Sequence, residues 1–147
     1  MKYAAKLDLS NLVTKIITLG DDVTNVEEYC ASTFGGNWKE SFTDGRRKQA
    51  ANVGYYYDAT KDKFILLRPY PSWTLDENDD WQPPVKRPTQ YQSQIPGAPT
   101  YEVEPGNIYN LPYVMSWDEE NQRWTGFDRV NIDIVYIWNP ETSNWSS

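Results

Sequence analysis

The side chains of this chain that could perform chemistry are few, and most are carboxylates. Of 147 residues, 21 are Asp or Glu, 14 are Lys or Arg, and none is His. The absence of His excludes Ser-His-Asp catalysis, Cys-His catalysis and His-ligated zinc. Cys30 is the only cysteine, so an internal disulfide, a CxxC pair or a thiolate metal cluster cannot form. We therefore expect neither a cofactor nor a metal site.

Adjacent carboxylates remain as candidates for acid–base catalysis. Asp79 and Asp80 form one pair, and Glu119 and Glu120 form another. A glycosidase needs two carboxylates about 5–9.5 Å apart, placed in different environments. Nothing in the sequence distinguishes the surroundings of one of these acids from those of another, and adjacent acids at hairpin tips are usually solvated. We predict that the chain is not an enzyme.

Aromatic side chains recur with a fixed spacing and offer a second kind of chemistry. Three segments start with an aromatic residue and an Asp or Asn and end on a second aromatic: Tyr57–Phe64, Trp117–Trp124 and Trp138–Trp145. A looser version contains Trp73 and Trp81. The Asp or Asn can start an Asx turn, so each segment is predicted to be a hairpin with its two aromatics paired across the strands.

These aromatic residues have two interpretations. As hairpin staples, their rings pack on a small sheet face; as a platform, they stack on sugar rings. We expect the first and keep the second as the alternative. The candidate staples are Tyr57, Phe64, Trp73, Trp81, Trp117, Trp124, Trp138 and Trp145.

The elements around these segments are predicted to be mainly strands. Residues Tyr3–Leu9 alternate between apolar and polar types, and Val13–Leu19 are rich in β-branched residues and half polar, so the two segments predict a hairpin; Trp38–Phe42 predicts a further strand. Towards the C-terminus, Asn107–Ser116 and Arg129–Trp138 are rich in Tyr, Val and Ile, and Pro112 restricts its strand to a sheet edge.

One short helix is predicted near residues 25–34. Thr24 or Asn25 can cap it, acidic residues occupy its first turn, and two glycines follow it. The predicted apolar stripe consists of Val26, Tyr29, Cys30 and Phe34. Burial on that stripe is the expected role of Cys30, with a reactive thiol as the alternative.

A Pro-rich segment separates the two ends of the chain. Residues 82–106 hold six of the ten prolines and show no sustained periodicity, so an internal helix or a central strand is not expected. We expect an extended segment, either a linker or an arm that docks on another surface through Tyr91, Ile95 and Tyr101. The expected organisation is a β module at 1–81, this segment at 82–106 and an antiparallel module at 107–147.

Charge and hydropathy restrict the partners. The net charge is −7, which repels phosphate backbones, so nucleic acid is not an expected partner. Apolar runs such as residues 64–67 are far shorter than the roughly 20 residues of a membrane span, and the N-terminus lacks an apolar signal core. A single thiol fits a protein made in a reducing compartment, most simply a cytoplasm.

Residues 33–85 hold a series of short motifs: GGNW at 35–38, DGRRK at 44–48, VGYYYD at 53–58, DKF at 62–64, PYPSWTLD at 69–76 and WQPPV at 81–85. Through these motifs, the chain resembles small proteins encoded by tailed bacteriophages of marine bacteria, cyanophages in particular. Residues 65–68, ILLR, replace a Pro-rich stretch of that family. The resemblance implies a structural role in the virion and carries over no catalytic residue.

Two functions are therefore expected in preference to an enzyme. The first is a minor virion structural protein, present in several copies, that binds other virion proteins as a capsid decoration, neck, baseplate or fibre component. The second is a carbohydrate-binding adhesin module of a phage tail fibre, which would bind a host glycan through exposed rings. The expected location is the virion, after synthesis in the cytoplasm of a bacterial host.

Overall fold

The computed structural model describes residues 1–147 and divides them into two units. Unit 1 consists of residues 1–69 and 76–81, and unit 2 of residues 70–75 and 82–147. The elements of unit 1 are β1 (Lys2–Leu7), β2 (Val13–Leu19), α1 (Val26–Phe34), β3 (Asn37–Ser41), β4 (Tyr56–Asp58) and β5 (Lys63–Ile65). The short strands β6 (Thr74–Leu75) and β7 (Trp81–Gln82) pair with each other, and unit 2 continues with β8 (Thr100–Glu104), β9 (Asn107–Asn110), β10 (Val114–Asp118), β11 (Arg123–Phe127), β12 (Tyr136–Asn139) and β13 (Asn144–Ser146). The prediction of a mainly β chain with small antiparallel sheets and one short helix is confirmed.

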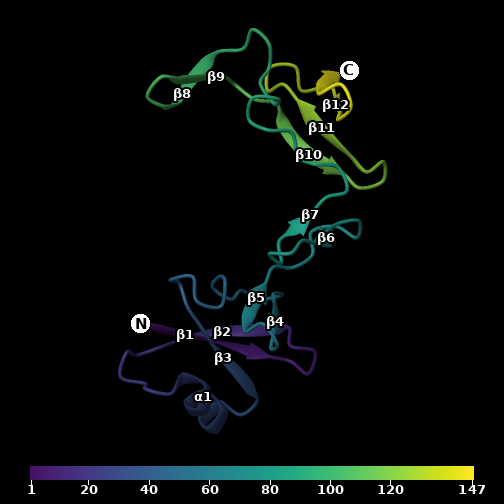
Figure 1. The fold of residues 1–147 in the computed structure, drawn as a ribbon. Helices are drawn as coiled ribbons and strands as arrows, with labels where there is room; N and C mark the ends of the chain where they lie inside the picture. The colour runs from purple at the N-terminus through teal and green to yellow at the C-terminus, as the bar shows by residue number, and fades with distance from the viewer. The chain divides into compact units, whose positions relative to one another are not determined.

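Unit 1 is built on a three-stranded antiparallel sheet in the order β2-β1-β3. Alternation along β1 sends neighbouring side chains to opposite faces. Ala4 packs in a cluster with Val26 and Cys30 of α1, whereas Ala5 packs in a cluster with Tyr57 and Phe64 of the β4–β5 hairpin. The helix and the hairpin therefore cover opposite faces of the sheet (Figure 1).

The helix begins and ends where the sequence predicts, but its buried stripe is narrower. The side chain of Asn25 accepts a hydrogen bond from the N–H of Glu28, and Gly35 follows with a φ of 71°. Val26 and Cys30 are buried, as predicted for this thiol. Tyr29 and Phe34 are 44% and 53% exposed, so the prediction that they share the buried face is wrong. A nine-residue helix covers too little of the sheet to bury a longer stripe.

Unit 2 is built on a four-stranded antiparallel sheet in the order β10-β11-β12-β13. Its core is a cluster of Trp117, Trp124 and Trp138, one from each of three neighbouring strands. Gly126 of β11 lies where a Cβ atom would come within 3.0 Å of Tyr113 and 3.2 Å of Trp145. Aromatic rings thus fill the space around this sheet up to its backbone.

Two predicted strands at the C-terminal end differ from the structure. Residues 107–116 are divided between β9 and β10, and the intervening Pro112 forms an isolated bridge with Gln94. Residues 129–135 form bends and turns, so that β12 begins only at Tyr136. The alternation of Val130, Ile132 and Ile134 predicted a strand here, but no neighbouring strand pairs with this segment.

The Pro-rich residues 82–106 belong to unit 2 and include β8, which pairs with β9 in a two-stranded sheet. Residues 90–93 form a turn, closed by a hydrogen bond from the N–H of Ser93 to the carbonyl of Thr89. The segment folds onto residues of its own unit.

Candidate functional site

In all three repeated segments, the first and second aromatic residues are direct partners across a hairpin. The ring centroids lie 5.2 Å apart for Tyr57 and Phe64, 5.3 Å for Trp117 and Trp124, and 5.3 Å for Trp138 and Trp145. Tilted and edge-to-face pairs at this separation stabilise a hairpin beyond the area that they bury. The same spacing therefore produces the same local structure three times.

The turn of each hairpin follows the mechanism expected from its Asp or Asn. In the first hairpin, Asp58 accepts hydrogen bonds from the N–H groups of Thr60 and Lys61. The residue two positions before the second aromatic adopts a left-handed backbone in every case: Asp62 with φ 51°, Gln122 with φ 48° and Ser143 with φ 54°. Sequence reasoning did not identify this position, because none of the three residues is glycine.

Trp73 completes the tryptophan cluster of unit 2. Its ring lies 6.1 Å from Trp117 and 6.2 Å from Trp124. The indole N–H of Trp117 donates to Glu119, 2.7 Å away, and the same carboxylate accepts from the backbone N–H and the hydroxyl of Ser72 at 2.9 and 2.7 Å. Because Trp117 and Trp124 are only 7% and 5% exposed, these rings form a core and offer little surface to a sugar.

The looser repeat does not form a fourth staple of the same kind. Trp81 donates its indole N–H to the carbonyl of Leu66 at 2.8 Å, and Arg68 lies 5.4 Å above its ring. Asp76 forms the expected turn by accepting from the N–H groups of Asn78 and Asp80. The Asx turn of the repeat is therefore present here, but Trp81 contacts Leu66 and Arg68 in place of a cross-strand aromatic partner.

Indole N–H groups also fasten the Pro-rich segment to unit 2. Trp124 donates to the carbonyl of Val85 at 2.8 Å, and Trp145 donates to the carbonyl of Gln92 at 2.9 Å. We name residues 85–92 the strap. Each end of the strap is thus held by a tryptophan of a different hairpin, and proline limits the conformations available between them.

The three predicted anchors of a docking arm all lie in unit 2, and two of them, Tyr91 and Tyr101, pack on the buried Tyr109. The ring of Tyr91 is 5.0 Å and that of Tyr101 is 6.1 Å from the ring of Tyr109. Tyr91 remains 69% exposed, Tyr101 is half-buried, and Ile95 is half-buried with its N–H bonded to the carbonyl of Leu111. Of the three, only Tyr91 presents most of its side chain to solvent.

Of the adjacent acids considered for catalysis, Asp79 and Asp80 form ion pairs. The side chain of Asp79 is only 7% exposed and contacts Lys61 at 2.9 Å and Lys63 at 2.6 Å. The hydrogen bond from Lys63, and after it the one from Lys61, holds the pKa of Asp79 below its usual value. Asp80 contacts Lys48 at 2.6 Å. Asp79 therefore lacks the raised pKa that a general acid requires.

Unit 1 also contains a network centred on Arg47. The guanidinium donates to the carboxylate of Glu27 at 2.9 Å, to the carbonyl of Glu40 at 2.7 Å and to Asp62 at 2.9 Å. The hydroxyl of Tyr57 donates to the same Asp62 carboxylate. Arg47 therefore connects the sheet strand β3 to α1 and to the β4–β5 hairpin, which cover the two faces of the sheet.

This network shifts the pKa of its members. Burial, followed by the hydrogen bond to Asp62, raises the pKa of Tyr57 to about 12. For Glu27, burial opposes ionisation, but hydrogen bonds from Glu40, Arg47 and Lys39 outweigh it, so the pKa is lowered. The hydrogen bond from Tyr57 and the nearby Arg47 lower the pKa of Asp62. At neutral pH, the lowered pKa values keep Glu27 and Asp62 ionised, and the raised pKa keeps on Tyr57 the proton that it donates to Asp62.

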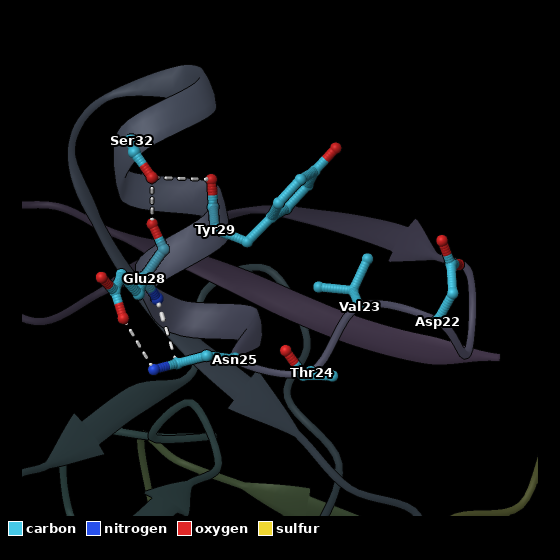
Figure 2. Close-up of a pocket in the computed structure, with 7 residues that line it drawn as sticks. All are labelled: Asp22, Val23, Thr24, Asn25, Glu28, Tyr29 and Ser32. Atoms are coloured by element: carbon cyan, nitrogen blue, oxygen red, sulfur yellow. Dashed lines mark hydrogen bonds between the residues drawn. The ribbon is translucent and has the colours of Figure 1, made fainter.

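A hollow at the start of α1 is lined by residues 22–25 and by Glu28, Tyr29 and Ser32 (Figure 2). Its polar groups bond to one another along the helix. The side-chain NH₂ of Asn25 donates to the carboxylate of Glu28, and the side-chain carbonyl of Asn25 accepts from the backbone N–H of Glu28. The hydroxyl of Ser32 donates to the backbone carbonyl of Glu28. The N-terminal donors of the helix are capped in this way by the chain itself. We assign the hollow a structural role.

Four exposed branched side chains lie in the connection between β11 and β12, here called the 128–135 loop. Val130, Ile132, Ile134 and Val135 are 84%, 65%, 40% and 58% exposed. The backbone makes two local turn hydrogen bonds, including one from the N–H of Ile134 to the carbonyl of Asn131, in place of ladder pairs. The alternation of β-forming residues in this segment predicts a strand, and the same residue types make it an exposed segment that is able to pair.

Comparison with known proteins identifies no relative. No protein-family model, no curated protein and no solved structure matches the chain. No group of three or more His, Cys, Asp or Glu side chains is placed to hold a metal ion. The helix α1 has nine residues, and no helix in the structure is long and apolar enough to span a membrane.

Proposed function

We propose that this chain is a minor structural protein of a tailed-bacteriophage virion, made in the cytoplasm of the host cell and present in several copies. Two kinds of observation support this role. The motifs between residues 35 and 85 resemble those of small phage proteins. Aromatic residues make up 15% of the chain, and six of them pair across the hairpins of the two units. The role includes capsid decoration and neck, baseplate or fibre positions.

The 128–135 loop is the observation that carries the proposal. Val130 and Ile132 are among the best β-forming residue types, yet they are largely exposed and belong to no sheet. An unpaired segment of this kind can add to the sheet edge of a neighbouring protein, with its alternate side chains entering pockets. Partner binding would bury the apolar groups that the isolated chain leaves in water.

Carbohydrate binding by stacking on the repeat tryptophans has less support. A stacking platform needs open ring faces, but Trp117, Trp124 and Trp138 are between 4% and 7% exposed. Their indole groups are also committed to the packing of the tryptophan cluster and, for two of them, to internal hydrogen bonds.

The proposal is tested by mass spectrometry of purified virions of the encoding phage, with a matched pair of variants. Val130→Ser with Ile132→Ser removes the apolar side chains of the loop; Val53→Ser with Leu67→Ser makes the same change at exposed positions of unit 1. We expect the wild-type chain and the unit 1 variant in the particles, and at least a tenfold loss of the loop variant. Absence of the wild-type chain from particles, or equal incorporation of both variants, would contradict the proposal.

A further inference from the structure

A small hollow in unit 2 is lined by two cations that make no ion pair. Its volume is about 160 Å³, and it lies between the strap and the tip of the β12–β13 hairpin. The lining includes Lys86, Arg87, Thr89, Gln92, Trp138 and Ser143. Cavities for drug-sized ligands are usually about 300–1,000 Å³, so this one suits a single small group or molecule.

The two cations differ from most basic residues of this chain. Half of the 14 Lys and Arg residues form ion pairs with carboxylates; Lys86 and Arg87 form none. The guanidinium of Arg87 instead lies 5.6 Å above the ring of Trp124. In an acidic protein, two neighbouring cations without a carboxylate partner create a local positive potential that an anion can neutralise.

The hollow is held in shape before any ligand binds. The N–H of Thr89 donates to the side-chain carbonyl of Gln92 at 2.9 Å, and the N–H of Gln92 donates to the hydroxyl oxygen of Thr89 at 3.3 Å. The two indole hydrogen bonds to Val85 and Gln92 fix both ends of the strap. A pre-organised site loses less conformational entropy on binding than a flexible one.

We propose that this hollow binds a carboxylate or sulfate group carried by a small, hydroxyl-rich molecule of sugar size. Arg87 can donate two parallel hydrogen bonds to such an oxyanion, and Lys86 adds a point charge. The hydroxyl of Ser143 and the side-chain NH₂ of Gln92, whose carbonyl is already bonded, remain to bond ring hydroxyls. The inference uses none of the 128–135 loop residues and is independent of the proposed function.

The test is an NMR titration of the full chain at low ionic strength with glucuronate, glucose 6-sulfate, glucose and inorganic sulfate. We expect one or both acidic sugars to bind and to shift the indole N–H signal of Trp138, which lines the hollow, while that of Trp38 in unit 1 stays unchanged. Glucose should cause no shift, and inorganic sulfate should bind at least tenfold more weakly than the better acidic sugar.

Matched variants separate a site from general charge attraction. Arg87→Gln should weaken binding of the acidic sugar at least tenfold, while Arg129→Gln, which removes an exposed arginine of unit 2 outside the hollow, should change it less than twofold. Unchanged signals from the other indole groups would show that Arg87→Gln keeps the fold. Failure of both acidic sugars to bind, equal binding of glucose or of inorganic sulfate, or equal losses for the two variants would overturn the inference.

Discussion

The hairpins Tyr57–Phe64 of unit 1 and Trp117–Trp124 of unit 2 share a spacing and a turn but are held to their units by different forces. Charged groups surround the first: Arg47 contacts Asp62 at its tip, and Lys61 and Lys63 contact Asp79. Indole rings and their N–H groups surround the second, where Trp124 packs on Trp73 and donates to the carbonyl of Val85.

The difference shows that the motif determines the hairpin and that its neighbours determine how the hairpin is anchored. The motif itself contributes one cross-strand pair, worth roughly 0.2–1 kcal/mol, together with a favourable turn. Residues distant in sequence add ionic contacts around the hairpin of unit 1, beside the apolar burial of Tyr57 and Phe64, and aromatic contacts around the hairpin of unit 2. The two units should therefore respond differently to substitution and to pH.

The largest effect is expected from Trp124→Ala. The substitution removes a ring at the centre of the tryptophan cluster and the donor to Val85, so the free energy of unfolding of unit 2 should fall by about 3–5 kcal/mol, the usual cost of deleting a buried large aromatic. Trp124→Phe keeps part of the ring and should cost less. Urea unfolding followed by NMR signals of each unit measures both. A loss below about 1 kcal/mol for Trp124→Ala would show that the cluster does not anchor the hairpin.

A smaller effect is expected from Arg47→Met, which keeps the apolar stem and removes the guanidinium. Glu27 would keep its hydrogen bonds from Lys39 and Glu40 but lose the one from Arg47, and the carbonyl of Glu40 would lose its guanidinium donor; losing such hydrogen bonds costs about 1–3 kcal/mol. The same urea experiment should show destabilisation of unit 1 alone. Arg46→Met is the matched control, because Arg46 is exposed and pairs only with the neighbouring Asp44; equal losses for both variants would contradict the role of Arg47.

Acidification should separate the units without a substitution. The pKa values of Glu27 and Asp62 are lowered in the folded state, so their stabilising effect is present above the unfolded values near 4 and is lost as the pH falls through the folded values. Unit 1 should therefore lose stability below about pH 5, by less than Arg47→Met costs, because a protonated carboxyl can keep one hydrogen bond. Urea midpoints at pH 7 and pH 3.5, read from Trp38 and Trp124, measure this. A larger fall of the urea midpoint for unit 2 than for unit 1 would contradict the expected difference between the units.

The smallest effect is expected at the turn position that both hairpins share. Gln122 adopts a φ of 48°, which glycine reaches without strain, so Gln122→Gly should raise the stability of unit 2 by up to about 0.5 kcal/mol after the entropy lost by the freer unfolded chain is subtracted. Thr125→Gly, in the adjoining strand, is the control and should destabilise. A loss of stability for Gln122→Gly would show that its side chain contributes to the turn.

The sequence predicted what depends on local spacing and missed what depends on distant partners. The pairing of Trp117 with Trp124 and the helix ended by Gly35 follow from residues close in the chain. The strand expected at Val130 did not form, because alternation shows that a segment can pair but not that a neighbour is present. The attachment of the strap to Trp124 and Trp145 likewise joins residues about 40 to 50 positions apart, which spacing alone does not reveal.

Hydrogen exchange of the indole N–H groups, resolved by NMR in the wild-type chain, tests most directly whether the tryptophans are inward-facing staples. The account predicts slow exchange for Trp117 and Trp124, whose donors bond to Glu119 and Val85, and for Trp38, which donates to Gly35. Exchange at the rate of a solvated indole for Trp117 and Trp124 would show that their rings face water, and it would contradict the account.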